Sequence, residues 1–198
     1  MPGASLGGGL PSDAGAPAVV RVLAVCGSLR AGSSNGALLA AAALVAPPGV
    51  EVAFYDGLGA LPPFNPDHDR ALDDPGLPAA VRDLRERVAA ADALVVSSPE
   101  YAHGVAGAFK NLLDWLVGGS EMPGRPVAQF HATGRAEHAP AHTAETLRTM
   151  SARLVDGAEV TVEVAGRPGA ALAADSAAAS VLRAGLAALA SAARGADR

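Results

Sequence analysis

Short apolar runs alternate with helical patterns along most of this chain, and this alternation limits the possible folds more than any other feature. The apolar runs are short and show no clean polar alternation, which is typical of strands buried on both faces. They lie at 19–26, 50–55, 93–97, 126–131 and 159–164. About five βα units in this order predict an α/β fold with a parallel sheet covered by helices on both sides.

The helical segments are recognised by their spacing and by the residues at their ends. An Ala/Leu-rich segment at 35–45 stops at two consecutive prolines, and Leu77 to Val88 repeats apolar residues on one face. Further helices are predicted from Val105 to Leu116, from Leu147 to Leu154, and after Asp175 or Ser176, either of which can cap the last helix. Residues 56–76 contain several Pro and Asp without periodicity and predict a long loop.

Composition and charge exclude several classes of protein. A net charge of −5 gives no long-range attraction to nucleic acid, and the one cysteine, Cys26, excludes an intrachain disulfide. No basic and apolar leader begins the chain, and no run reaches the roughly 18 apolar residues of a membrane span. We therefore expect a cytoplasmic protein, with a disordered Gly/Pro/Ser-rich tail at 1–17 and one domain at 18–194.

The turn after the first apolar run has the composition of a phosphate-binding loop. It reads Gly27-Ser28-Leu29-Arg30-Ala31-Gly32-Ser33-Ser34-Asn35 and leads into a predicted helix. Free N–H groups at a helix N-terminus favour an anion, hydroxyls of Ser28, Ser33 and Ser34 can donate to phosphate oxygens, and Arg30 can add a charged pair. An ordinary βα loop whose serines cap the helix remains the alternative.

A second loop follows the third apolar run and reads Ser97-Ser98-Pro99-Glu100-Tyr101-Ala102-His103-Gly104. Pro99 stiffens it, and Tyr101 or His103 can pack on a flat ring. Glu100 beside His103 also permits acid–base chemistry, but we assign both residues positioning roles. Because ligands of doubly wound sheets bind at the carboxyl ends of the strands, this loop and the phosphate loop are expected to lie on one edge.

Three motifs together resemble the NADPH-dependent FMN reductase family. They are Gly-Ser-x-Arg-x-x-Ser-x-Asn from Gly27, Ser-Pro-Glu-Tyr from Ser98, and Lys-Asn-Leu-Leu-Asp-Trp from Lys110, in this order. The resemblance covers residues 19–165. It implies a flavodoxin-like three-layer sandwich with a five-stranded parallel sheet in the order 2-1-3-4-5, and a homodimer or homotetramer with flavin sites near the interface.

The resemblance also implies which residues bind the cofactor. The first motif would hold the FMN phosphate, the second would lie along the isoalloxazine ring, and a third loop at 131–138 would contribute weakly. The implied cofactor-binding residues are Ser28, Arg30, Ser33, Ser34, Asn35, Pro99, Glu100, Tyr101, Ala102, His103, Gly104, Thr133 and Gly134. The chain departs from the family pattern at Ala102, Gly104 and Ala106, where relatives often have Asn, Ser and Pro.

Other conspicuous residues are predicted to be structural. Lys110, Asn111, Asp114 and Trp115 suit a salt bridge, a contact to a neighbouring loop and a packing aromatic. The five histidines do not have zinc-site spacing, so no metal is expected. Residues 64–67, in the long loop, are either surface or a rim of the flavin site.

The implied function is that of an oxidoreductase that passes a hydride from NADPH or NADH through bound FMN to a small acceptor, such as a quinone or free flavin. Because the cofactor carries this chemistry, no catalytic side chain is assigned. Three alternatives remain: a flavodoxin-like single-electron carrier, a non-enzymatic flavin-binding protein, and a hydrolase that uses Ser28 or Ser98.

Overall fold

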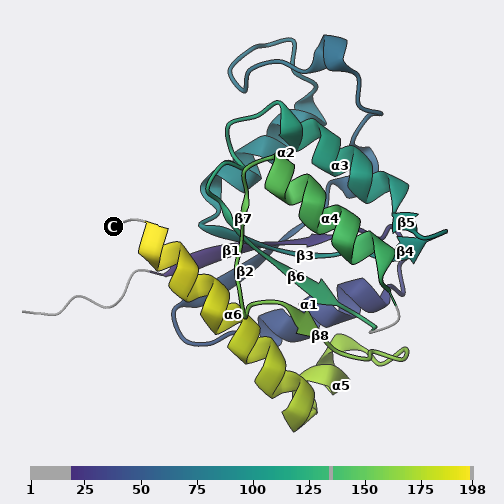
Figure 1. Cartoon of the computed structure of the whole chain (residues 1–198), viewed down its shortest axis with the longest axis vertical. Helices are drawn as coiled ribbons and strands as arrows, with labels where there is room; N and C mark the ends of the chain where they lie inside the picture. The colour runs from purple at the N-terminus through teal and green to yellow at the C-terminus, as the bar shows by residue number, and fades with distance from the viewer. Residues whose placement is uncertain (1–18, 134–135, 197–198) are drawn as a thin grey trace, which may run out of the picture.

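A parallel β-sheet forms the centre of the computed structural model, which describes residues 19–133 and 136–196 (Figure 1). The strands lie in the order β2-β1-β3-β6-β7, and each neighbouring pair is parallel. Their bounds are β1 Val20–Cys26, β2 Val50–Tyr55, β3 Ala93–Ser97, β6 Pro126–His131 and β7 Arg153–Leu154. The predicted α/β fold and strand order are confirmed; the predicted tail at 1–17 lies outside the described residues.

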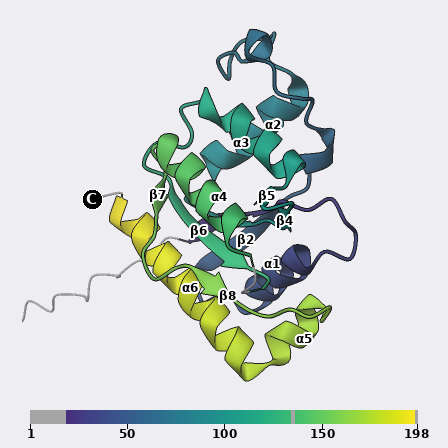
Figure 2. The same ribbon diagram turned by 45° about the vertical axis from the view of Figure 1, so that its right-hand side comes forward.

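Helices cover both faces of the sheet and make a three-layer sandwich (Figure 2). One layer contains α1 (Ser34–Leu44), α5 (Gly169–Ala174) and α6 (Ser176–Ala196), and the other contains α2 (Ala79–Ala90), α3 (Gly107–Val117) and α4 (His138–Thr149). Strand residues alternate between the two cores: Val22 belongs to the first and Leu23 to the second. Burial on both faces explains why the strands read as continuous apolar runs.

The fifth strand of the sheet is interrupted. Both β7 and β8 (Val160–Thr161) pair with β6, β7 near its start and β8 near its end. Backbone hydrogen bonds from Val162 to His131 and from Val164 to Ala132 extend the second piece beyond Thr161, close to the predicted 159–164. The prediction that Leu154 lies in a helix is wrong, because α4 ends at Thr149 and Leu154 lies in β7.

Helix α6 is long and apolar enough, by length and composition, to cross a membrane, with a mean hydropathy of 1.4 over Ser176–Gly195. Its apolar stripe, however, is used within the fold: Leu182, Leu186 and Leu189 are fully buried in the first core. Asp175 caps the helix, since its Oδ1 accepts the N–H groups of Ala177 and Ala178 at 3.0 and 3.1 Å. The apolar character of α6 is that of a core helix.

The long loop at 56–76 is fastened to α3 by the third motif. Its two short 3₁₀ helices are η1 (Leu58–Ala60) and η2 (Pro66–His68). The Asn111 side chain accepts from the Phe64 N–H at 2.7 Å and donates to the Pro62 carbonyl at 2.9 Å, and Trp115 Nε1 donates to the same carbonyl at 2.8 Å. Lys110 forms an ion pair with Asp114. The structural interpretation of this motif is confirmed.

A buried arginine fastens the same loop to α2. The Arg85 side chain is 1% exposed; its guanidinium bonds Asp69 at 2.6 Å, the Arg70 carbonyl at 2.7 Å and the Trp115 carbonyl at 2.7 and 3.0 Å. Every nitrogen of the guanidinium therefore has a partner, as burial of a charge requires. The loop is held against α2 and α3, and none of its residues lines the cavity described next.

Candidate functional site

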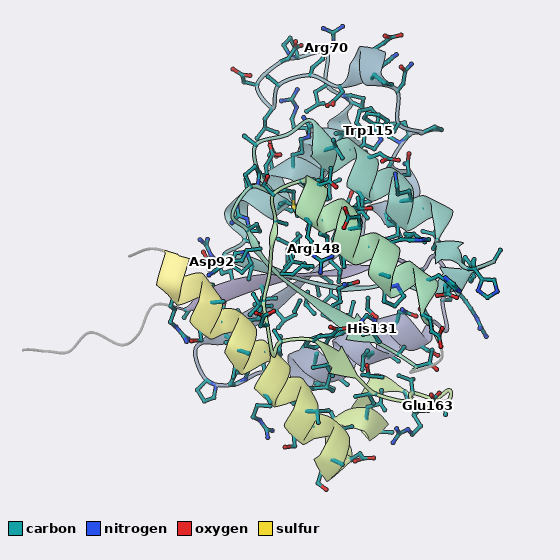
Figure 3. All side chains as sticks on the ribbon, viewed as in Figure 1. Arg70, Asp92, Trp115, His131, Arg148 and Glu163 are labelled. Carbon is teal, nitrogen blue, oxygen red and sulfur yellow. The ribbon has the colours of Figure 1, made fainter. Side chains whose placement is uncertain are left out.

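A cavity of about 470 Å³ opens at the carboxyl edge of the sheet, beside the loops that follow β1, β3 and β6. This volume lies in the range of small-molecule and cofactor sites. Figure 3 labels His131 at the end of β6 and Glu163 on the segment after β8, which mark this edge, whereas Trp115 lies far away on the α3 side. Its lining residues are Ser28, Arg30, Ser33, Ser34, Asn35, Ser98, Pro99, Glu100, Tyr101, His131, Ala132, Thr133, Ala136, Glu163 and Ala165.

The first wall is the turn between β1 and α1. Ser33 is the N-cap of α1, and its hydroxyl accepts the Gly36 N–H at 3.3 Å; Ser28 Oγ accepts the Arg30 N–H at 3.3 Å. Arg30 is exposed, and its guanidinium makes no hydrogen bond or ion pair with any described residue. The turn therefore offers a helix N-terminus, several hydroxyls and an uncommitted cation to one end of the cavity, which suits a phosphate group.

This turn is held close to the loop after β3. Gly27 donates its N–H to the Ser97 carbonyl at 2.8 Å, and a Cβ at Gly27 would lie 2.5 Å from Ser98 Oγ and 2.9 Å from Phe109 Cβ. Asn35 is 7% exposed, and its Nδ2 donates to Ser97 Oγ at 3.1 Å. Asn35 lines the cavity, but its amide also joins the two loops.

The second wall contains a short hairpin that the sequence did not signal. Strands β4 (Glu100–Tyr101) and β5 (Gly104–Val105) pair antiparallel, and Ala102 and His103 between them have φ of +49° and +59°. Two consecutive positive φ values are those of a type I′ turn, which usually contains Asn or Gly. Pro99, Glu100 and Tyr101 line the cavity, whereas the three residues of the turn that follows do not. These three are Ala102, His103 and Gly104.

Glu100 joins this hairpin to the N-terminus of α4. Its Oε2 accepts the N–H groups of Glu137, His138 and Ala139 at 3.1, 2.8 and 2.8 Å. The hydrogen bond from Ala139, followed by those from His138 and Glu137, lowers the pKa of Glu100 from its ordinary value. The carboxylate is thus held ionised as a helix cap, and it fixes the position of the third loop relative to the second.

The third loop and the chain after β8 complete the cavity. Thr133 lines it, and its hydroxyl donates to Glu163 Oε2 at 3.0 Å. Gly134 lies outside the described residues. Ala165 enters the lining through a tight turn in which Ala165 and Gly166 have positive φ and the Arg167 N–H bonds the Val164 carbonyl. Glu163 and Ala165 were not predicted as site residues, because they reach the cavity only through the pairing of β8 with β6. His131 begins the third loop but was not singled out as a site residue.

A group of three histidines lies near this edge. The rings of His103 and His138 pack edge to face with centroids 4.6 Å apart, and the His142 ring centroid is 6.5 Å from that of His138. Within residues 19–133 and 136–196, no group of three or more His, Cys, Asp or Glu side chains has the arrangement of a metal site. Which side chains contact a cofactor stays a prediction, but most of those expected from the sequence line the same cavity.

Known proteins resemble this chain in sequence and in fold. The family model for NADPH-dependent FMN reductase matches residues 20–166. The NAD(P)H-dependent FMN reductase of Pseudomonas aeruginosa is 36% identical over 154 residues, which cover 74% of this chain and 79% of that protein. The quinone reductase of Escherichia coli is 35% identical over 109 residues, or 55% of each protein.

Among solved structures, the NAD(P)H:acceptor oxidoreductase FerB of Paracoccus denitrificans superposes with a TM-score of 0.72 at 24% identity, covering 89% of this chain and 98% of that one. That likeness concerns the fold, while the family model spans β1 to the turn after β8 and so includes every cavity wall. The chain belongs to the NADPH-dependent FMN reductase family.

Proposed function

We propose that the cavity at the carboxyl edge binds FMN and that the chain uses it to pass a hydride from NADPH or NADH to a small acceptor such as a quinone or free flavin. Family membership makes the chain an FMN-dependent NAD(P)H oxidoreductase. One observation supports the placement of the cofactor: a phosphate-compatible turn and a ring-compatible loop line the same cavity.

The residues of the cavity fit the two ends of FMN. Arg30, with its uncommitted guanidinium, and the hydroxyls of Ser28, Ser33 and Ser34 would hold the phosphate. Pro99 and Tyr101 would lie against the ring. Tyr101 is 59% exposed, so its side chain is available to contact the flavin ring. When bound, FMN supplies the redox chemistry, and the protein holds it and leaves one ring face open.

The proposal assigns Glu100 and Asn35 to the framework of the site. Glu100 bonds the α4 N-terminus and Asn35 bonds Ser97, so both fix the spacing between loops. A site whose walls are held in place before the ligand arrives loses less entropy on binding. Thr133 and its partner Glu163, which both line the cavity, would meet the polar chain between phosphate and ring.

The test removes the phosphate contacts without touching a core. In Ser28→Ala/Arg30→Ala, FMN affinity should fall by about 100-fold or more, because a charge-assisted contact and a hydroxyl contact are lost together. The matched control is Ser180→Ala/Arg183→Ala on α6, where both residues are exposed. Flavin absorbance after gel filtration measures the result. Equal flavin content in the two variants would refute the assignment of the phosphate end.

Anaerobic mixing with NADPH separates the proposal from the alternatives. Rapid bleaching of bound flavin, followed by turnover with a quinone, is expected of the reductase; a single-electron carrier or a passive flavin binder would not bleach.

We further propose a homodimer or homotetramer in the cytoplasm, a location consistent with the free thiol of Cys26. Sedimentation of the purified protein checks the assembly.

A further inference from the structure

His131 and Glu159 form a hydrogen-bonded pair at the cavity, and the proposed flavin contacts do not use it. His131 Nε2 lies 2.7 Å from Glu159 Oε1. The His131 side chain is 12% exposed and that of Glu159 is 64% exposed. The pair therefore connects a mostly buried imidazole to a carboxylate that is largely in solvent.

The register of two strands sets this pair. His131 is the last residue of β6 and is paired in register with Thr161 of β8, so Glu159, two residues earlier, lies on the same face of the sheet. Figure 3 labels His131 at the end of the β6 arrow, at the edge where the cavity opens. The placement is fixed by the sheet rather than by a mobile surface loop.

The other ring nitrogen of His131 is available. Within the described residues, Nδ1 makes no hydrogen bond, and it is not among the buried polar atoms without a partner. It is therefore accessible, and His131 is one of the residues that line the cavity. A histidine that exchanges protons with a substrate has this arrangement: one ring nitrogen is hydrogen-bonded to a carboxylate, and the other is accessible.

Reduction of a quinone to a hydroquinone requires two electrons and two hydrogens. Hydride transfer accounts for the electron pair and one hydrogen, so the second hydrogen must arrive as a proton. Arg30 does not release a proton near neutral pH, and the Glu100 carboxylate is held ionised by three N–H groups of α4. Histidine is the side chain that enzymes use most often to transfer protons, and His131 lines the cavity.

We infer that His131, oriented by Glu159, is the proton donor to a quinone oxygen in this cavity. In the doubly protonated ring the Nδ1–H bond breaks and an O–H bond forms on the substrate as it receives the hydride, which leaves neutral His131 with its hydrogen on Nε2, donated to Glu159. Nδ1 then regains a proton from solvent. The inference rests on the proposed function and deepens it, because it names a quinone-type acceptor whose reduction consumes a proton.

The test compares two acceptors in the FMN-loaded enzyme. Benzoquinone needs protons, whereas ferricyanide accepts electrons without any. In His131→Gln, kcat with benzoquinone should fall about 100-fold, within the range for loss of a general acid, while ferricyanide reduction changes less than about twofold. Glu159→Gln should lose about 10-fold with benzoquinone only. His142→Gln, an exposed histidine on α4 outside the cavity lining, is the matched control.

A measurement on the flavin-free protein is independent of activity. Long-range ¹H–¹⁵N NMR should show that neutral His131 carries its hydrogen on Nε2, donated to Glu159, with Nδ1 unprotonated. The opposite tautomer would overturn the inference.

The kinetic outcomes are also decisive. Equal loss with both acceptors would mean that His131 positions the cofactor, and no loss with benzoquinone would mean that water supplies the proton; either result overturns the inference. A wild-type protein that binds no FMN, or is not reduced by NADPH, overturns the proposed function, and this failure is recognised before any His131 variant is made.

Discussion

Gly27→Ala should disrupt the contact between the phosphate loop and the loop after β3. The added Cβ would lie 2.5 Å from Ser98 Oγ, 2.7 Å from Ser98 Cβ and 2.9 Å from Phe109 Cβ. Gly27 cannot easily retreat, because its N–H is bonded to the Ser97 carbonyl at 2.8 Å. Overpacking of this kind costs about 1–3 kcal/mol. For a chain of this size, that corresponds to a loss of roughly 2–12 °C in Tm.

The matched control for this prediction lies in the same loop. Gly32 has no heavy atom within 4 Å of an added Cβ, so Gly32→Ala should leave Tm within about 2 °C of wild type. Adding Ser98→Gly to Gly27→Ala removes two of the three close contacts and should restore part of the lost stability. Thermal unfolding of the flavin-free proteins measures stability, and FMN titration should show weaker binding for Gly27→Ala only. Equal Tm values for the two alanine variants would refute this account.

Three other changes test single features of the fold. Arg85→Met should lower the unfolding free energy in urea by about 3–5 kcal/mol, because Asp69 and two carbonyls lose a buried charged partner; an unchanged midpoint would contradict this. Ala102→Asn should raise the unfolding free energy by about 0.5–1 kcal/mol, since Asn tolerates the positive φ at this position, and a loss of stability would argue against the type I′ turn. The lowered pKa of Glu100 means that its cap stabilises the fold above the ordinary carboxyl range and is lost as pH falls through the lowered pKa. Glu100→Gln should therefore unfold more easily at pH 7 and lose less stability than wild type between about pH 5 and 3; parallel curves would refute the cap.

The sheet could be predicted from the sequence because its strands are apolar runs with abrupt ends. The runs at 50–55, 93–97 and 126–131 coincide with β2, β3 and β6. The error at Leu154 has a physical cause. Leu147, Met150 and Leu154 pack against the same core, and their spacing along the sequence is the spacing of one helix face. The hairpin at Ala102 and His103 could not be predicted, because its turn needs two consecutive positive φ values and lacks the Asn or Gly that usually signals them.

The site was predicted less completely, because local motifs do not indicate what folding brings to them. The turn at Gly27 signals a phosphate from its own residues, but the acceptor of the Asn35 amide is a hydroxyl on β3, and the donors to Glu100 lie on α4. Motif residues that face one cavity can thus be divided into those whose polar atoms are already bonded within the protein and those, like Arg30, whose polar atoms remain available. Arg30 can gain a full interaction with a ligand without losing an internal one, and the Ser28 and Ser33 hydroxyls, which accept hydrogen bonds within the turn, can still donate their O–H groups. The walls of this cavity are therefore built by the first kind, and its affinity for an anionic cofactor depends on the second.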